Sequence, residues 1–495
     1  MVKNSIFNLL GSGLNTVVSI ASIPLLIKFL GLDGYGLWIY FISIIGFINL
    51  AEAGLSTAGV VFLSKYLENE NSQERDIDIS SALSVISTFL FLIGILVFLL
   101  IFYVVSGHAV HHIDIESDAT TSLYIAFRLG SVYVFFKLLS QILVGIEKAY
   151  KRYDLVNIIE SVQMLLLNIG LILIAKSSGS IESMALWWTA LGIFSFFVHF
   201  IICRFLLVGI ELRYSLRGSY AKDIFSFSGF VWGGAIAQSL FSQFDRIFVG
   251  SLLGAEQLGI YSAYTGICKT INTFSSVVVQ PLVPEVSAAN VTSVGGFSSV
   301  KKHIHFSVSV NIFLAVCVGG MLMLFSDLVL RTLFGFTTDK TSEYAFLFLI
   351  IVYTLYSFNA VGYFILLSLK KSKLVMKNIW NSVLIFLLLL IICTKFWGLY
   401  GAIFANVGYL ITLMLLTDGL REVGVSSKEF FNITMFPLIW FLLVCMVAIL
   451  TVGHSNLLVT VSVSALLFTA VVAWAVVIGF KSELSKMANF RSREL

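Results

Sequence analysis

Four cationic side chains lie inside long apolar segments of this chain: Arg128, Lys137, Arg246 and Lys269. An ionisable group inside a membrane span costs roughly 2.5 to 3.5 kcal/mol on insertion scales, so it usually faces a cavity or a counter-charge. Arginine binds phosphate oxygens through a planar fork of donors, and lysine binds them as a point charge. Such cations near the middle of a membrane predict a cavity for an anionic, phosphate-bearing substrate.

Polar residues at helical spacing accompany these cations. Arg246 shares one predicted face with Gln243, and Lys269 shares another with Asn272. The first apolar segment carries a neutral polar stripe that includes Asn15, and the second carries Glu52. Packing between helices is the alternative for the serines and threonines of these stripes, because small polar residues are common at helix interfaces in membranes.

Some candidate substrate-binding residues have a second possible side-chain partner. Asp245 neutralises Arg246 only if the two side chains curl together, since neighbours on a helix point about 100° apart. Arg128 and Lys137 project from opposite faces of one helix, and Lys137 has the alternative of reaching lipid phosphates. The candidates are Arg246, Lys269, Arg128, Asp245, Glu52, Lys137, Asn15 and Asn272.

No catalytic or metal site is expected. The five cysteines stand singly in apolar stretches, and His108, His111 and His112 lie in one loop without ligand spacing. The chain has no phosphate-binding G-x-x-x-x-G-K-[ST] loop. Transport would therefore use an ion gradient, the membrane potential or the gradient of the substrate, with no cofactor.

The elements that must position these residues are membrane helices. Hydrophobic side chains make up 58% of the 495 residues, charged ones only 12%, and the mean hydropathy is +0.98. This composition has too little polar surface for a soluble protein and predicts an all-α polytopic membrane protein. We expect fourteen spans, at about 5–29, 36–62, 80–106, 121–145, 154–175, 182–207, 224–252, 258–284, 304–330, 343–368, 374–394, 398–418, 431–452 and 456–479.

One phrase of the sequence occurs twice. Residues 30–38 read Leu-Gly-Leu-Asp-Gly-Tyr-Gly-Leu-Trp, and residues 253–261 read Leu-Gly-Ala-Glu-Gln-Leu-Gly-Ile-Tyr. Each copy ends one apolar segment and opens the next, so it predicts a duplicated helical hairpin and two pseudo-symmetric six-helix lobes. The expected lobes are 1–222 and 223–421, and residues 422–495 add a helix pair and a tail.

The basic residues predict the orientation. If the N-terminus is cytoplasmic, 22 of the 31 lysines and arginines lie on the cytoplasmic side and five on the other. Cytoplasmic loops of membrane proteins keep such an excess of positive charge. Both termini are therefore expected in the cytoplasm.

The two copies of the phrase lie within longer motifs. Ile23-Pro24 through Leu37, followed by Glu52-Ala53-Gly54-Leu55, resembles the amino-terminal signature of bacterial O-antigen and polysaccharide flippases. The stretch from Phe244-Asp245-Arg246 through Gly259-Ile260-Tyr261 to Pro281-Leu282-Val283-Pro284 resembles their central signature. Those proteins belong to the multidrug/oligosaccharidyl-lipid/polysaccharide exporter superfamily. The chain departs from them at Glu52, where the family commonly has Asp, and in its fourteen spans, where many members have twelve.

The resemblance implies a flippase in the bacterial inner membrane. It would move an undecaprenyl-diphosphate-linked oligosaccharide, such as an O-antigen repeat unit, from the cytoplasmic to the periplasmic leaflet by alternating access. Arg246, Lys269 and Arg128 would hold the diphosphate or acidic sugars in a cavity lined by spans one, two, seven and eight. The implied partners are the lipid-linked oligosaccharide, membrane lipid, a polysaccharide polymerase and a chain-length regulator, without nucleic acid.

Three alternatives remain at this point. Fourteen spans also resemble the lipid II flippases. A multidrug exporter of the same superfamily would be expected to have an acidic cavity, which the cationic excess opposes. A membrane glycosyltransferase or O-antigen polymerase would usually show a large loop with paired carboxylates, whereas Asp114, Glu116 and Asp118 stand in one short loop.

Overall fold

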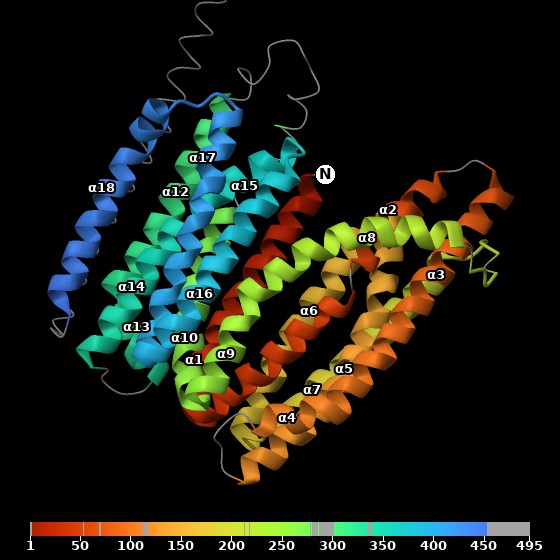
Figure 1. Ribbon diagram of the computed structural model, residues 1–495, viewed down its shortest axis with the longest axis horizontal. Helices are drawn as coiled ribbons and strands as arrows, with labels where there is room; N and C mark the ends of the chain where they lie inside the picture. The colour runs from red at the N-terminus through yellow and green to blue at the C-terminus, as the bar shows by residue number, and fades with distance from the viewer. Residues whose placement is uncertain are drawn as a thin grey trace, which may run out of the picture. The chain divides into compact units, whose positions relative to one another are not determined.

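The computed structural model describes residues 2–52, 54–68, 71–111, 117–211, 213–216, 218–277, 279, 286, 301–334 and 339–452. Every secondary-structure element in these ranges is a helix (Figure 1). Eight of the helical segments are long and apolar enough to cross a membrane. The prediction of an all-α polytopic protein is therefore confirmed, and the number of fourteen spans stays a prediction. The predicted span 456–479 and the residues Asp114 and Glu116 lie outside the described ranges.

The chain divides into two compact units. Unit 1 comprises residues 1–263 and 383–405, and unit 2 comprises residues 264–382 and 406–495. This division separates the parts of the chain that are compact in themselves. The lobe boundaries at residues 222 and 421 stay a prediction.

Unit 1 begins with two helices that meet at the non-helical residue Gly31 and together carry the label α1. Its elements are α1 (Val2–Ile48), η1 (Asn49–Glu52), α2 (Leu55–Leu67), α3 (Ser72–Leu99), η2 (Leu100–Val105), α4 (Ser106–His111), α5 (Ser117–Ala149), α6 (Tyr153–Ser177), α7 (Ile181–Leu206), α8 (Gly218–Ser239), η3 (Leu240–Phe244), α9 (Asp245–Leu253), the start of α10 (Ala255–Val277) and the end of α16 (Ser372–Ala405). Helices α3, α5 and α7 run side by side (Figure 1).

Unit 2 holds the remaining described helices. They are the rest of α10 and of α16, with α12 (Lys301–Leu324), α13 (Ser326–Phe334), α14 (Lys340–Tyr356), α15 (Asn359–Ser368), η5 (Asn406–Thr412), α17 (Leu413–Glu422) and α18 (Ser427–Thr451). Helices α15 and α17 approach closely at Gly362, which has no side chain. A Cβ on Gly362 would stand 2.0 Å from the Leu415 carbonyl oxygen.

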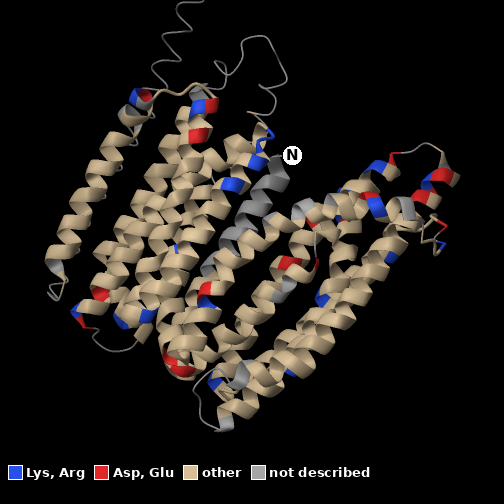
Figure 2. Cartoon of the chain, in the orientation of Figure 1, with Lys and Arg blue, Asp and Glu red and all other residues tan. Residues whose placement is uncertain are grey.

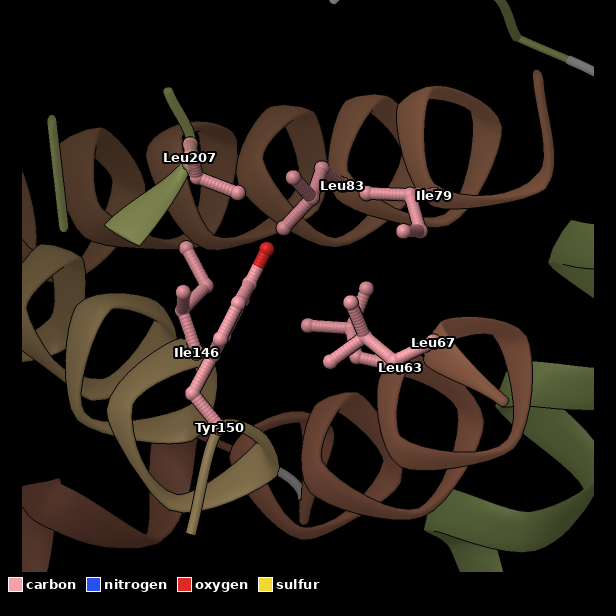
Figure 3. Close-up of a pocket in the computed structure, with 7 residues that line it drawn as sticks. All are labelled: Leu63, Leu67, Ile79, Leu83, Ile146, Tyr150 and Leu207. Carbon is pink, nitrogen blue, oxygen red and sulfur yellow. The ribbon is translucent and has the colours of Figure 1, made fainter. Parts of the chain in front are cut away.

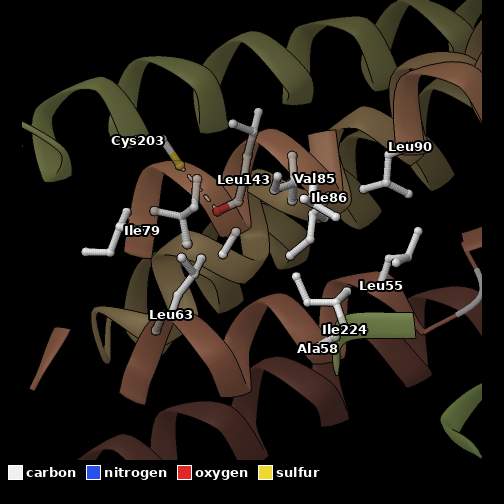
Figure 4. Packing of buried hydrophobic residues seen from close by; sticks show 14 residues of the cluster. Leu55, Ala58, Leu63, Ile79, Val85, Ile86, Leu90, Leu143, Cys203 and Ile224 are labelled. Atoms are coloured by element: carbon white, nitrogen blue, oxygen red, sulfur yellow. Dashed lines mark hydrogen bonds between the residues drawn. The ribbon is translucent and has the colours of Figure 1, made fainter. Parts of the chain in front are cut away.

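A cluster of buried aliphatic side chains holds α2, α3, α5 and α7 together. Leu55 and Ala58 from α2, Val85 and Ile86 from α3 and Leu143 from α5 belong to it (Figure 4). The Cys203 thiol of α7 donates a hydrogen bond to the Leu143 carbonyl oxygen at 3.3 Å. The cysteine is thus a packing residue here, as its isolated position in the sequence predicts.

Charged side chains lie mainly at helix ends and in connecting turns. Figure 2 shows long uncharged helix shafts with a few charged residues within them. Large apolar side chains on these shafts are exposed, such as Leu96 at 66%, Phe205 at 74% and Leu442 at 66%. Exposed apolar surface of this kind fits helices that are solvated by lipid.

Candidate substrate site on the repeated hairpins

The two copies of the repeated phrase have the same backbone conformation at their first glycine. Gly31 has φ 74° and ψ 176°, and Gly254 has φ 87° and ψ 178°. This region of φ and ψ is essentially confined to glycine. Glycine at these two positions therefore lets the chain reverse with almost no loop, and the predicted duplicated hairpin is present in unit 1.

The two hairpins contact each other through a second pair of glycines. A Cβ on Gly36 would stand 1.8 Å from the Ala255 carbonyl oxygen, and a Cβ on Gly259 would stand 2.5 Å from the Leu32 carbonyl oxygen. Each hairpin thus packs its glycine against the backbone of the other, in a reciprocal contact. The Tyr40 and Ser251 hydroxyls form a hydrogen bond of 3.1 Å beside this contact.

Asp245 is completely buried at the start of α9. One carboxylate oxygen accepts a hydrogen bond from the Tyr261 hydroxyl at 2.9 Å, and the other accepts one from the Arg246 backbone N–H at 2.9 Å. The carboxylate therefore fixes α9 against α10. Its contact with substrate stays a prediction.

The Arg246 side chain has a different environment. Its Nε atom and the Gln243 Oε1 atom are buried without a hydrogen-bond partner among the described residues. The positively charged Arg246 side chain interacts electrostatically with the buried Tyr35 side chain of α1. The guanidinium forms no ion pair with Asp245 in the described part of the chain. The π-helical segment η3 precedes α9, and π-helical turns often occur at functional sites.

Glu52 lies in a second polar group of unit 1. The Glu52 Oε1 atom accepts a hydrogen bond from the Ser56 backbone N–H at 3.2 Å. The Glu52 carboxylate also interacts electrostatically with the positive charges of Lys137 and Lys148. Lys137 of α5 therefore lies within electrostatic range of Glu52, and its contact with lipid phosphate stays a prediction. Nearby, the Trp232 indole N–H donates to the Leu50 carbonyl oxygen at 2.7 Å and joins α8 to η1.

Arg128 lies in an aromatic environment between α5 and η2. Its guanidinium carbon is 4.6 Å from the Phe102 ring centroid and 4.3 Å from that of Tyr124, whose hydroxyl also accepts a hydrogen bond from it. Cation–π contacts stabilise a desolvated arginine by about 2 kcal/mol. The Arg128 Nε atom, like that of Arg246, is buried without a hydrogen-bond partner among the described residues, and its contact with substrate stays a prediction.

Lys269 and Asn272 belong to the part of α10 in unit 2. Lys269 is half-buried and has a partner within the protein, and its carbonyl oxygen accepts a hydrogen bond from the Thr273 hydroxyl at 3.3 Å. The Asn272 carbonyl oxygen accepts one from Ser275 at 3.3 Å. The Asn15 side chain lies outside the described side chains.

A buried hydrogen-bonded pair on α5 and α7 was not predicted from the sequence. The His199 Nδ1 atom lies 2.8 and 3.0 Å from the two Glu147 carboxylate oxygens, with 2% and 0% of the side chains exposed. Tyr261 was also missed as the partner of Asp245. Both pairs join residues from different helices, so spacing along one helix gave no signal. Their only sign in the sequence is a charged residue inside an apolar segment.

Residues 1–290 match a family described as "Polysaccharide biosynthesis protein". The chain belongs to this family. It is also 21% identical to a Shigella flexneri protein named "Putative O-antigen transporter", over 81% of this chain and 93% of that protein.

The solved structures that resemble this family member are transporters. The lipid II flippase MurJ in an inward closed conformation has a TM-score of 0.72 and 16% identity, covering 94% of this chain and 98% of MurJ. An inward-facing MATE multidrug resistance transporter has a TM-score of 0.56 and 14% identity, covering 85% and 98%. The chain is a multi-pass membrane protein of the polysaccharide biosynthesis family, and it has the fold of these transporters.

Proposed function

We propose that the protein moves an undecaprenyl-diphosphate-linked oligosaccharide from the cytoplasmic to the periplasmic leaflet of the bacterial inner membrane. Membership of the polysaccharide biosynthesis family and the name of the Shigella flexneri relative support this class of cargo. An O-antigen repeat unit, or that of another surface polysaccharide, is the proposed sugar. Both termini lie in the cytoplasm in this proposal.

The observation that carries the proposal is the environment of Arg246. Its neighbour Asp245 is committed to Tyr261, so the guanidinium is left without that counter-charge. The buried Nε of Arg246 and Oε1 of Gln243 offer one donor and one acceptor without protein partners among the described residues. A diphosphate can take the arginine donors in fork geometry.

The proposed transport cycle is alternating access between two lobes. Arg246 and Lys269 bind the diphosphate, and the polyprenyl tail stays in lipid. Arg128, Asn15 and Asn272 contact the diphosphate or the sugars, while Asp245, Glu52 and Lys137 set the charge around them. An ion gradient or the membrane potential drives the cycle, since the sequence carries no nucleotide-binding loop. A polymerase and a chain-length regulator are the further partners in this proposal.

The test is a flipping assay with the full chain reconstituted in vesicles and a lipid-diphosphate oligosaccharide as cargo. Arg246→Ala removes a charge-assisted hydrogen bond worth about 1.5 to 3 kcal/mol, so flipping is expected to slow by about tenfold to a hundredfold. Arg246→Lys keeps the positive charge but lacks the planar fork of donors, so its flipping rate should lie between those of the parent and of Arg246→Ala. Lys269→Ala is expected to slow flipping as well.

Lys428→Ala is the matched control, because it removes one exposed cation at the start of α18. It should flip at the parent rate. If Arg246→Ala and Lys269→Ala also flip at the parent rate, the cationic site is wrong. If the parent flips lipid II or expels a cationic drug but not the oligosaccharide lipid, the cargo is wrong. If the parent extends or transfers sugars, the flippase proposal itself fails.

A further inference from the structure

Two turns of the chain, one in each unit, hold a lysine in the left-handed backbone region. Lys151, between α5 and α6, has φ 60°, and Lys370, between α15 and α16, has φ 58°. They are the only residues other than glycine with positive φ in the described part of the chain. Glycine is the usual residue at such a helix end, because a side chain is disfavoured there.

The hydrogen bonds of the two turns are the same. The Lys151 N–H donates to the Lys148 carbonyl oxygen at 2.9 Å, and the Arg152 N–H donates to that of Glu147 at 2.9 Å. In unit 2, the Lys370 N–H donates to the Leu367 carbonyl oxygen at 3.0 Å, and the Lys371 N–H donates to that of Leu366 at 2.9 Å. Each lysine therefore has a fixed backbone at the end of a helix.

The charges of the two turns are also arranged alike. The second cation of each turn is paired with a carboxylate, Arg152 with Asp154 and Lys371 with Glu422. The first cation, Lys151 or Lys370, is exposed and forms no ion pair with the described residues. Each turn thus presents one ammonium group that none of the described residues neutralises.

Apolar contacts anchor both turns. Tyr150, next to Lys151, extends its ring among Leu63, Leu83 and Ile146 in an apolar pocket that is too narrow for water (Figure 3). In unit 2, Leu366 and Val375 pack with Leu415 on either side of the turn. The lysine backbones are therefore supported by packing as well as by hydrogen bonds.

Exposed apolar side chains occur on the helices next to each of these lysines. Tyr153 is 50% exposed and Ile158 is 60% exposed on α6, and Leu367 is 42% exposed on α15. A cation beside such a surface suits a ligand with an anionic head and an apolar tail. A soluble phosphate would gain nothing from the apolar neighbours.

We propose that Lys151 and Lys370 each bind the phosphate headgroup of an anionic phospholipid at the membrane surface, while its acyl chains lie along the adjoining helix. The proposal concerns the surrounding bilayer and does not depend on the identity of the transported cargo. It explains the choice of lysine at two positions where glycine would satisfy the backbone. The free-energy cost of placing a lysine at positive φ is offset by its contact with the lipid.

The test measures how phosphatidylglycerol, compared with phosphatidylcholine, raises the thermal stability of the full chain in detergent. Lys151→Gly and Lys370→Gly remove the charge and suit the left-handed backbone, so both variants should be as stable as the parent without lipid. Each is expected to weaken the apparent affinity for phosphatidylglycerol by about fivefold. Lys151→Arg and Lys370→Arg should retain the parent affinity.

The matched control is the double variant Lys65→Gln with Lys428→Gln, which removes two exposed lysines from α2 and α18. It should bind phosphatidylglycerol like the parent. The proposal is overturned if the double glycine variant keeps the parent affinity, or if the control loses as much. It is also overturned if phosphatidylcholine stabilises equally, or if inorganic diphosphate protects as well as the lipid does.

Discussion

The two repeated hairpins share a backbone but differ in chemistry. Both reverse at a glycine of the same conformation, and both press a second glycine against the other hairpin. At the position equivalent to Asp245, the first hairpin has Ser22, which donates to the Ser19 carbonyl oxygen of its own helix. At the position equivalent to Tyr261, it has Trp38, which packs against the Phe41 and Trp188 rings.

This difference indicates which part of the repeat serves the frame and which serves the site. The glycines are needed in both copies, because the reversal and the close contact depend on backbone space. The buried carboxylate, the phenol and the adjacent arginine occur in one copy only. The second hairpin is therefore the one that carries the candidate site, and the first supplies aromatic packing.

The largest effect is expected from Gly36→Ala, which tests the contact between the hairpins. The new Cβ would lie 1.8 Å from a backbone oxygen that no rotamer change can move. Overpacking of this kind costs about 3 kcal/mol, so thermal unfolding in detergent should begin at a clearly lower temperature. Gly259→Ala should also lower the unfolding temperature, by a smaller amount.

Gly34→Ala is the control for this substitution. Its Cβ would lie 3.0 Å from the Leu30 side chain, within the first hairpin itself, and would not touch the second hairpin. If Gly36→Ala is as stable as Gly34→Ala, the reciprocal glycine contact does not exist in solution.

The Asp245–Tyr261 hydrogen bond tests the chemistry that distinguishes the second hairpin. A double-mutant cycle with Asp245→Asn and Tyr261→Phe should give a coupling of about 1.5 to 3 kcal/mol, since the acceptor is charged and buried. The same cycle at Ser22→Ala and Trp38→Phe should give no coupling. A coupling near zero for the first pair would mean that the two hairpins differ in sequence but not in energetics.

Gly31→Ala and Gly254→Ala test what the hairpins share. Both glycines have open space around the Cβ position, so any loss comes from the backbone conformation alone. Each substitution should lower the free energy of unfolding by about 1 to 3 kcal/mol, and by similar amounts. Unequal losses, measured by thermal or denaturant unfolding, would show that one turn tolerates a side chain and that the repeat is not equivalent.

The smallest effect is expected at the hydrogen bond between Tyr40 and Ser251. Tyr40→Phe should cost about 1 kcal/mol, as is typical for a neutral hydrogen bond that is partly buried. Ser251→Ala should cost the same, and the double variant no more than either single one. Additive losses would indicate that the two hydroxyls act independently.

Much of the fold could be predicted because the signals are local. Long apolar segments gave the membrane helices, and the repeated glycines gave the two turns. The sequence predicts two spans at 374–394 and 398–418, and the structure has a non-helical glycine, Gly398 at φ 56°, at the first residue of the second span. The partners of the charged residues were harder, because they depend on which helix faces which.

The sequence by itself determined that this protein is a helical membrane protein with a duplicated hairpin and cations inside its apolar segments. Hydrophobicity, glycine and charge act through local physical chemistry, so they can be read without coordinates. Only the tertiary structure decided that Asp245 bonds to Tyr261, that His199 meets Glu147 and that Arg128 lies between two aromatic rings. Those contacts join residues distant in sequence or fix side-chain direction, and helix packing selects them.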